Sequence, residues 1–353
     1  MKRVALKSVL LSTIMVLLSC DEPITVVTNY VHSDGSVTRH IEMRSSKNKF
    51  KVSDLQVPFD NTWTIKDTLI VGLKKDTTWI KTAEKLFRNI DEINLSYKSD
   101  SGANKGISRK AAFVKKFRWF NTIYRYSENI DKTMRYGYPV SDFLNKEELN
   151  YFYTPQTIND EKLKGADSLK YKAIADSVKN KTDRWSEKCV FSEWVGEFCD
   201  LIEARGGSDN LRDTFKLKEG EFVELLKKNQ NKLDSLWKEG VILKEMIGEK
   251  NAKEFRSEAD SAVNLMAKRV FPDFKDYSVK IIMPGKVIGT NGFIDETDQL
   301  LWPVKSDYFI AEPYEMWAES GVVNKWAWIV TGIFLIFVIT GLVIRIVSKK
   351  GGR

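Results

Sequence analysis

The chain has 353 residues, of which 42% are hydrophobic and 12% aromatic, so it can bury a core and is not an intrinsically disordered protein. The formal net charge of +8 would suit a nucleic-acid-binding protein, but seven of the basic residues lie at the two ends of the chain. They are Lys2, Arg3, Lys7, Arg345, Lys349, Lys350 and Arg353. Without them the net charge falls to about +1, so the positive charge no longer supports a nucleic-acid partner.

The N-terminus has the pattern of a secretory signal. Met1-Lys2-Arg3 is a short basic region, and Val9–Leu18 is apolar. The ending Leu17-Leu18-Ser19-Cys20 resembles the lipobox of bacterial lipoproteins, in which the cysteine becomes the acylated first residue of the mature protein. Residues 1–19 are therefore predicted to be a lipoprotein signal peptide and Cys20 the lipidation site. An ordinary signal peptide with a chance cysteine is the alternative.

Residues 20–140 are predicted to form the β-rich first half of an ectodomain. Two β-rich runs flank Ser33–Ser36, which predicts a hairpin with Asp34-Gly35 as a two-residue turn. Further strands are expected at Thr62–Val71 and along the basic and aromatic run Ser108–Tyr126. Apolar residues at helical spacing predict a helix near residues 79–94.

Residues 141–270 are predicted to be a helical insertion, because glycine and proline become sparse and apolar residues recur every three or four positions. Three helices are expected, at Asp183–Arg205, Glu221–Glu239 and Asn251–Arg269, the first ending at Gly206-Gly207. Cys189 and Cys199 would lie about 15 Å apart along one helix. Two buried free thiols are therefore favoured over a disulfide, unless Gly196 breaks the helix.

Residues 271–320 are predicted to be the β-rich second half. Strands are expected at Tyr277–Met283, Lys286–Gly289, Gln299–Val304 and Asp307–Ile310, with a turn at Asn291-Gly292. The predicted fold class is α+β: an antiparallel sheet domain completed by both halves, with a large helical insertion and one C-terminal transmembrane helix.

The predicted transmembrane helix is residues 326–344, a run without a charged residue. Trp326 and Trp328 lie at its start, and the basic tail 345–353 follows, which indicates that the tail is cytoplasmic. Acyl chains on Cys20 and this helix would then anchor the chain at both ends. We expect the inner (cytoplasmic) membrane, with the ectodomain facing the periplasm; Asp21 resembles a residue that retains lipoproteins there in some bacteria.

One family resemblance follows from these features. Pro284–Gly292 with Leu301-Trp302 resembles the terminal hairpin of LppM-type bacterial envelope lipoproteins, which also combine a lipobox, an early Asp-Gly hairpin and a C-terminal span with a basic tail. The resemblance implies an envelope domain of a lipid-binding type that is not an enzyme. The helical insertion departs from that pattern.

Catalytic and metal-binding motifs are not found in the sequence. The two histidines, His32 and His40, lie on the first hairpin without a partner for a metal, so no metal, no cofactor and no enzymatic activity are expected. The best candidate for a ligand site is the basic and aromatic run, because cations suit anionic headgroups and aromatic rings suit acyl chains or sugars. Its candidate residues are Arg109, Lys115, Lys116, Arg118, Trp119, Tyr124 and Arg125.

Three interpretations of that run remain open. It could be a central strand that packs aromatic rings inward and extends its cations outward, a surface for lipid or glycan, or a protein contact. The sequence thus predicts a doubly anchored, non-enzymatic envelope lipoprotein that binds membrane lipids or other amphiphilic envelope molecules. The alternative is a scaffold that docks other envelope proteins through the helical insertion. Nucleic acid is not an expected partner.

Overall fold

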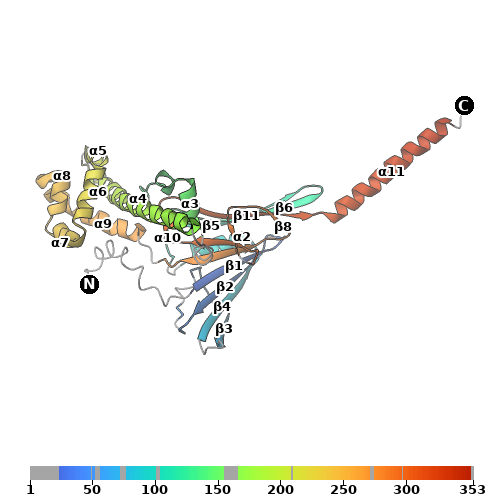
Figure 1. The fold of residues 1–353 in the computed structure, drawn as a ribbon, viewed down its shortest axis with the longest axis horizontal. Coiled ribbons are helices and arrows are strands. Elements are labelled where there is room, and N and C mark those ends of the chain that lie inside the picture. Colours follow the sequence, from blue (N-terminus) through green and yellow to red (C-terminus); the bar gives the residue numbers. More distant parts are fainter. Residues whose placement is uncertain are drawn as a thin grey trace.

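The computed structural model describes residues 24–48, 50–51, 56–71, 77–100, 104–154, 166–207, 210–270, 274–295 and 297–350. Two β-sheets form the centre of the molecule (Figure 1). A block of helices lies at one end, and a long C-terminal helix leaves from the other (Figure 1). The fold class is α+β, as the sequence predicted.

The larger sheet has seven strands in the order β3-β4-β2-β1-β7-β10-β9. The pairing of β1 with β7 is parallel, and the other pairings in this sheet are antiparallel. Because β1 comes from the first half of the chain and β7 from the second, both halves complete one sheet, as expected. The strands are β1 (Ile24–Val31), β2 (Val37–Ser45), β3 (Thr64–Val71), β4 (Thr77–Phe87), β7 (Tyr277–Ile282), β9 (Phe293–Ile294) and β10 (Leu300–Val304).

The smaller sheet has four antiparallel strands in the order β5-β6-β11-β8. Its strands are β5 (Arg109–Phe117), β6 (Asn121–Ile130), β8 (Lys286–Thr290) and β11 (Tyr314–Val323). Alternate residues of β6 and β11 are buried, and they share one core with the inward residues of the larger sheet and of α2 (Ile90–Lys98). The second sheet was not foreseen, because the sequence analysis expected one sheet.

The helical block runs from η3 (Val140–Asp142) to α9 and has a hydrophobic core of its own. Its helix α4 is 39 residues long and ends where Gly206 adopts φ +83° and Gly207 donates its N–H to the Ile202 carbonyl at 3.0 Å. Cys189 and Cys199 are both buried and free, as favoured from the sequence. The helices are α3 (Lys146–Tyr153), α4 (Ala166–Ala204), α5 (Asn210–Leu217), α6 (Glu219–Lys228), α7 (Leu233–Lys238), α8 (Val241–Glu254) and α9 (Arg256–Val270), with η5 (Gln230–Lys232) between α6 and α7.

The helical block is joined to the sheets through the segment that follows β6. The backbone N–H groups of Arg135 and Tyr136 donate to the buried Glu193 carboxylate at 2.8 and 2.7 Å. The Tyr136 ring lies directly over Gly196, where a Cβ atom would come within 2.0 Å of it. The missing side chain at Gly196 therefore lets this connection pack closely against α4.

The C-terminal helix α11 (Lys325–Lys350) follows β11 after a single residue, Asn324. Its segment from Lys325 to Arg345 is long and apolar enough to span a membrane, and little of it is buried within the protein. This helix includes the predicted span, residues 326–344.

Several predicted elements differ in type or extent from the structure. Residues 79–87 of the predicted helix 79–94 belong to strand β4, because this threonine-rich and β-branched segment pairs with β2 and β3 along its length; the helix there is Ile90–Lys98. Ser108–Tyr126 is not one strand but the hairpin β5–β6. Asp307–Ile310 lies in the short helix α10 (Ser306–Phe309). Glu221–Glu239 is broken into α6, η5 and α7.

Both predicted turns also differ. The first hairpin has a three-residue loop, Ser33–Gly35, closed by a bond from the His32 N–H to the Ser36 carbonyl, and Thr28 faces His40. Asn291-Gly292 does not close a hairpin, because β8 belongs to the smaller sheet and β9 to the larger one. Asn291 instead joins the sheets: its side chain donates to the Glu315 carbonyl and accepts from the Trp302 indole.

Candidate membrane-facing site

The hairpin β5–β6 carries most of the predicted ligand site, and its tip is a two-residue loop, Trp119-Phe120. Arg118 and Asn121 close this loop through reciprocal backbone hydrogen bonds of 2.8 and 3.1 Å. In Figure 1 the hairpin projects toward the start of α11. A tight turn made of two large aromatic residues is unusual for a water-exposed hairpin, where glycine and asparagine are preferred.

The tip of the hairpin packs against the first turns of α11. Asn324 holds the two together: its backbone N–H donates to the Phe120 carbonyl, and its side chain donates to the Arg118 carbonyl, each at 2.8 Å. The Trp119 indole donates to the Thr331 hydroxyl at 2.9 Å. The hairpin and the candidate span are therefore one assembly, although some two hundred residues separate them.

An aromatic cluster surrounds this contact. Phe117 stacks on Trp326 with a centroid separation of 6.2 Å, Trp119 meets the same indole edge-on at 5.3 Å, and Phe120 lies 4.4 Å from Trp328. Despite these contacts, Phe117, Trp119, Trp326 and Trp328 each keep about half of their surface exposed. Aromatic side chains that pack yet stay exposed beside an apolar helix are typical of a membrane–water interface.

Four of the predicted site residues lie at this end of the hairpin. Lys115, Lys116, Arg118 and Trp119 are all exposed. Lys115 donates to the Ser33 carbonyl at 3.1 Å and lies over the Tyr124 ring, which ties the β1–β2 loop to the same end. Cations and aromatic rings of the run therefore gather on one exposed tip.

The other three predicted residues have different surroundings. Tyr124 is buried in the core. Arg109 is buried and forms an ion pair with Asp100 while lying over the Tyr97 ring. Arg125 lies on the outer face of the smaller sheet, 4.3 Å from the Trp317 ring and close to Glu315 and Glu319. These three are therefore parts of the folded domain rather than of the tip.

A buried charged network between the sheets was missed in the sequence analysis. The Glu128 carboxylate accepts hydrogen bonds from Arg39 and Tyr126 at 2.6 Å, from Tyr97 at 2.7 Å and from Asn29 at 2.8 Å. Arg39 is 1% exposed. The two-residue period of β2 could have revealed it, because Arg39 lies on the same inward face as Val37, Ile41 and Met43.

The electrostatics of the network follow from its pairing. Burial alone would raise the pKa of Glu128, but the Arg39 guanidinium and the tyrosine hydroxyls outweigh burial, and the pKa is lowered. Burial and the nearby carboxylate raise the pKa of Tyr126. Side chains from β1, β2, α2 and β6 donate to this buried carboxylate, so we assign it to joining the two sheets.

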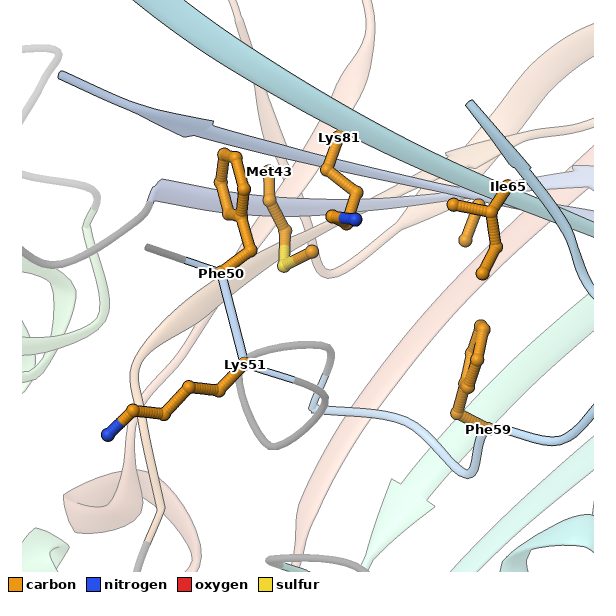
Figure 2. Close-up of a pocket in the computed structure, with 7 residues that line it drawn as sticks. Met43, Phe50, Lys51, Phe59, Ile65 and Lys81 are labelled. Atoms are coloured by element: carbon orange, nitrogen blue, oxygen red, sulfur yellow. The ribbon is translucent and has the colours of Figure 1, made fainter. Parts of the chain in front are cut away.

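A small cavity of about 80 Å³ lies elsewhere, on the larger sheet (Figure 2). Its wall is mainly apolar, and its lining residues are Met43, Phe50, Lys51, Phe59, Ile65, Lys81 and Ala83. The Lys81 ammonium pairs with Asp67 at 2.9 Å, and the Lys51 side chain points away from the apolar wall in Figure 2. None of the predicted site residues lines this cavity.

Cys20, the predicted lipidation site, and the signal peptide 1–19 lie outside the described residues. Among the residues that the structure describes, no group of three or more His, Cys, Asp or Glu side chains could hold a metal ion. No protein-family model matches the chain, and neither a curated protein nor a solved structure is detectably similar to it.

Proposed function

We propose that this protein is a non-enzymatic envelope lipoprotein of the LppM-like type, anchored by acyl chains on Cys20 and by α11, that binds lipids or other amphiphilic envelope molecules at the membrane surface. The observation that supports it best is the exposed aromatic and basic tip of β5–β6, packed against the first turns of an apolar helix. The aromatic rings offer contact to acyl chains, and Lys115, Lys116 and Arg118 offer charge to anionic headgroups. In this proposal the ectodomain faces the periplasm from the inner membrane.

The alternative, a scaffold that docks through the helical block, has less support. A docking face for a stable partner usually presents contiguous apolar surface. Among the side chains described in α3 to α9, Leu217 is the one large apolar residue that is exposed. The described side chains of residues 221–269 include no exposed large apolar residue. We therefore interpret the helical block as a part of the ectodomain that has its own core and a surface in contact with water.

Native mass spectrometry with lipid extraction, on the full-length protein in detergent, tests the proposed function. We expect the acyl mass on Cys20 and a co-purifying lipid, whose retention falls in the triple variant K115Q/K116Q/R118Q. The matched control, K172Q/K179Q/K238Q, removes three exposed cations of the helical block and should retain the lipid. A protein that retains no lipid contradicts the proposal. A protein that retains another protein instead of lipid also contradicts it and favours the scaffold.

A further inference from the structure

Three segments far apart in the sequence meet where α11 leaves the ectodomain: residues 114–121, 284–291 and 321–328. The register of the smaller sheet aligns Lys116 with Ile123, Ile123 with Gly321, and Gly321 with Lys286. Lys116 and Lys286 therefore lie at the same level on opposite edges of the sheet. Strand β8 was not part of the predicted ligand site, and its register brings it to the same end as the hairpin tip.

The charge of these three segments is of one sign. They contain Lys115, Lys116, Arg118, Lys286 and Lys325, and no Asp or Glu. The part of the chain that the structure describes provides no ion pair for Lys116, Arg118, Lys286 or Lys325. The ectodomain as a whole carries about +1, so without these five cations the rest of it carries a formal charge of about −4, and this end is a separate concentration of positive charge.

Exposed apolar side chains accompany the cations. Ile288 and Val323 are each 56% exposed, and Val287 on β8 and Val114 on β5 are also exposed. They lie in the same three segments as Phe117, Trp119, Trp326 and Trp328, which are also exposed. A soluble surface rarely presents so many apolar groups next to unpaired cations, whereas the headgroup layer of a bilayer accommodates both.

The depth of the tip agrees with a bilayer as the partner. Thr331, which accepts the Trp119 hydrogen bond, is six residues after Lys325, or roughly 9 Å along the helix axis. The Trp119 ring is thus held level with the second turn of the candidate span, beside Trp326. A helix that crosses the hydrocarbon from about this level places the ring in the interfacial region.

We infer that this end of the ectodomain, formed by the β5–β6 tip, β8 and the start of α11, docks onto the anionic lipid surface of the same bilayer that α11 crosses. The partner is the headgroup layer as a surface, rather than a single lipid carried in a cavity. The inference rests on the proposed function and deepens it, because it names the partner of the tip and adds β8 to the contact.

Hydrogen–deuterium exchange on the full-length protein in nanodiscs tests the inference. The probes are discs of phosphatidylcholine with and without phosphatidylglycerol. Residues 286–290 are suitable reporters, because β8 is an edge strand of the smaller sheet. We expect their amides and those of 118–121 to exchange roughly tenfold more slowly in the anionic discs. The difference should vanish at high salt, where the Debye length falls to about 3 Å.

The triple variant K116Q/R118Q/K286Q should lose this protection, whereas the control K172Q/K179Q/K238Q should keep it. Equal exchange in both discs, or anion-dependent protection that persists in the triple variant, overturns the docking inference. Lipid retention in native mass spectrometry is a separate result, so a protein that retains lipid but does not dock keeps the proposed function and loses this inference. If the triple variant does not fold, the salt dependence of the unmodified protein decides the question.

Discussion

The indole N–H of Trp119 donates to the hydroxyl of Thr331 at 2.9 Å, which joins the tip of a β-hairpin to a helix that is apolar enough to span a membrane. The contact sits among three aromatic pairs and hydrogen bonds to Asn324. Because so many short contacts meet there, we expect the ectodomain and α11 to move as one body rather than about a flexible linker.

Thr331→Val keeps the branched shape of the side chain and removes the acceptor of the Trp119 bond. We expect a loss of about 0.5–1.5 kcal/mol in the free energy of unfolding of the full-length protein in detergent, measured with urea. Trp119→Phe should cost a similar amount alone and little more in the Thr331→Val background. Thr340→Val is the control, because Thr340 bonds only to the Ile336 carbonyl of its own helix. Strictly additive losses would show that the two side chains do not interact.

Glu128→Ala should be among the most destabilising single substitutions in the chain. It leaves the Arg39 guanidinium buried without its carboxylate, and breaking a buried pair in this way costs about 3–5 kcal/mol. Replacing both partners, Arg39→Met with Glu128→Leu, should cost less than the sum of the single changes. Glu84→Gln on β4 is the control, since that carboxylate is largely exposed. A loss at Glu128 no larger than at Glu84 would contradict the assigned network.

Gly196→Ala should loosen the helical block from the sheets. The added Cβ would lie 2.0 Å from the Tyr136 ring, and such overpacking typically costs about 1–3 kcal/mol. Gly220→Ala in α6 is a matched control, because nothing lies within 4 Å of its Cβ and alanine favours a helix. Thermal unfolding should therefore move down for Gly196→Ala and slightly up for Gly220→Ala. Equal shifts would mean that Tyr136 is not docked on Gly196.

The sequence predicted the fold class, with its block of helices and its C-terminal apolar helix, because these depend on local periodicity and apolar length. It failed where pairing partners decide the conformation. Residues 77–87 match a helical spacing, yet strands β2 and β3 on either side hold them as β4. The division into two sheets depends on Asn291, whose side chain bonds to the backbone of β11 and to Trp302, and no local pattern specifies that.

The candidate site was predicted in part for the same reason. A run of cations and aromatic residues is visible in the sequence, but the turn at Trp119-Phe120 decides which of them reach the tip. Tyr124 and Arg109 fall on the inward positions of their strands and are buried, whereas Lys286 and Ile288 join the tip only through the pairing of β8 with β11. Pairing between strands that are distant in the sequence therefore determines which residues reach the tip.

Acid should destabilise the contact between α3 and α4. Hydrogen bonds from Lys181, from the Asn145 backbone and from Ser177 lower the pKa of Glu148 from 4.5 to about 2. A carboxylate with a lowered folded-state pKa contributes its stability above the unfolded-state value and loses it as the pH falls. Stability should thus be constant above about pH 5 and fall between pH 4.5 and about 2. Glu148→Gln should flatten this dependence, and an unchanged acid profile would show that Glu148 does not contribute to it.

Strand β1 starts, and α11 leaves, at opposite ends of the sheets. Val26 of β1 is level with Ser278, Ser278 is level with Pro303, and the Tyr314 hydroxyl donates to the Pro303 carbonyl at 2.8 Å. Tyr314 begins β11, whose nine residue steps to Val323 cover about 30 Å before α11 starts. The start of β1 therefore lies about 30 Å from the start of the candidate span.

Cys20 precedes Ile24 by four residues, which reach at most about 14 Å when extended. In the proposed arrangement, acyl chains on Cys20 enter the bilayer of α11 more readily if the ectodomain leans toward it, and that lean opposes docking of the β5–β6 tip and β8. Inserting a flexible Gly-Ser linker of about 30 Å reach after Asp21 keeps the Cys20-Asp21 sequence and removes the restraint. We expect the anion-dependent protection of residues 286–290 to increase with the linker, and the same insertion to have no effect in Cys20→Ser. An unchanged protection in the acylated protein would show that the two anchors do not compete.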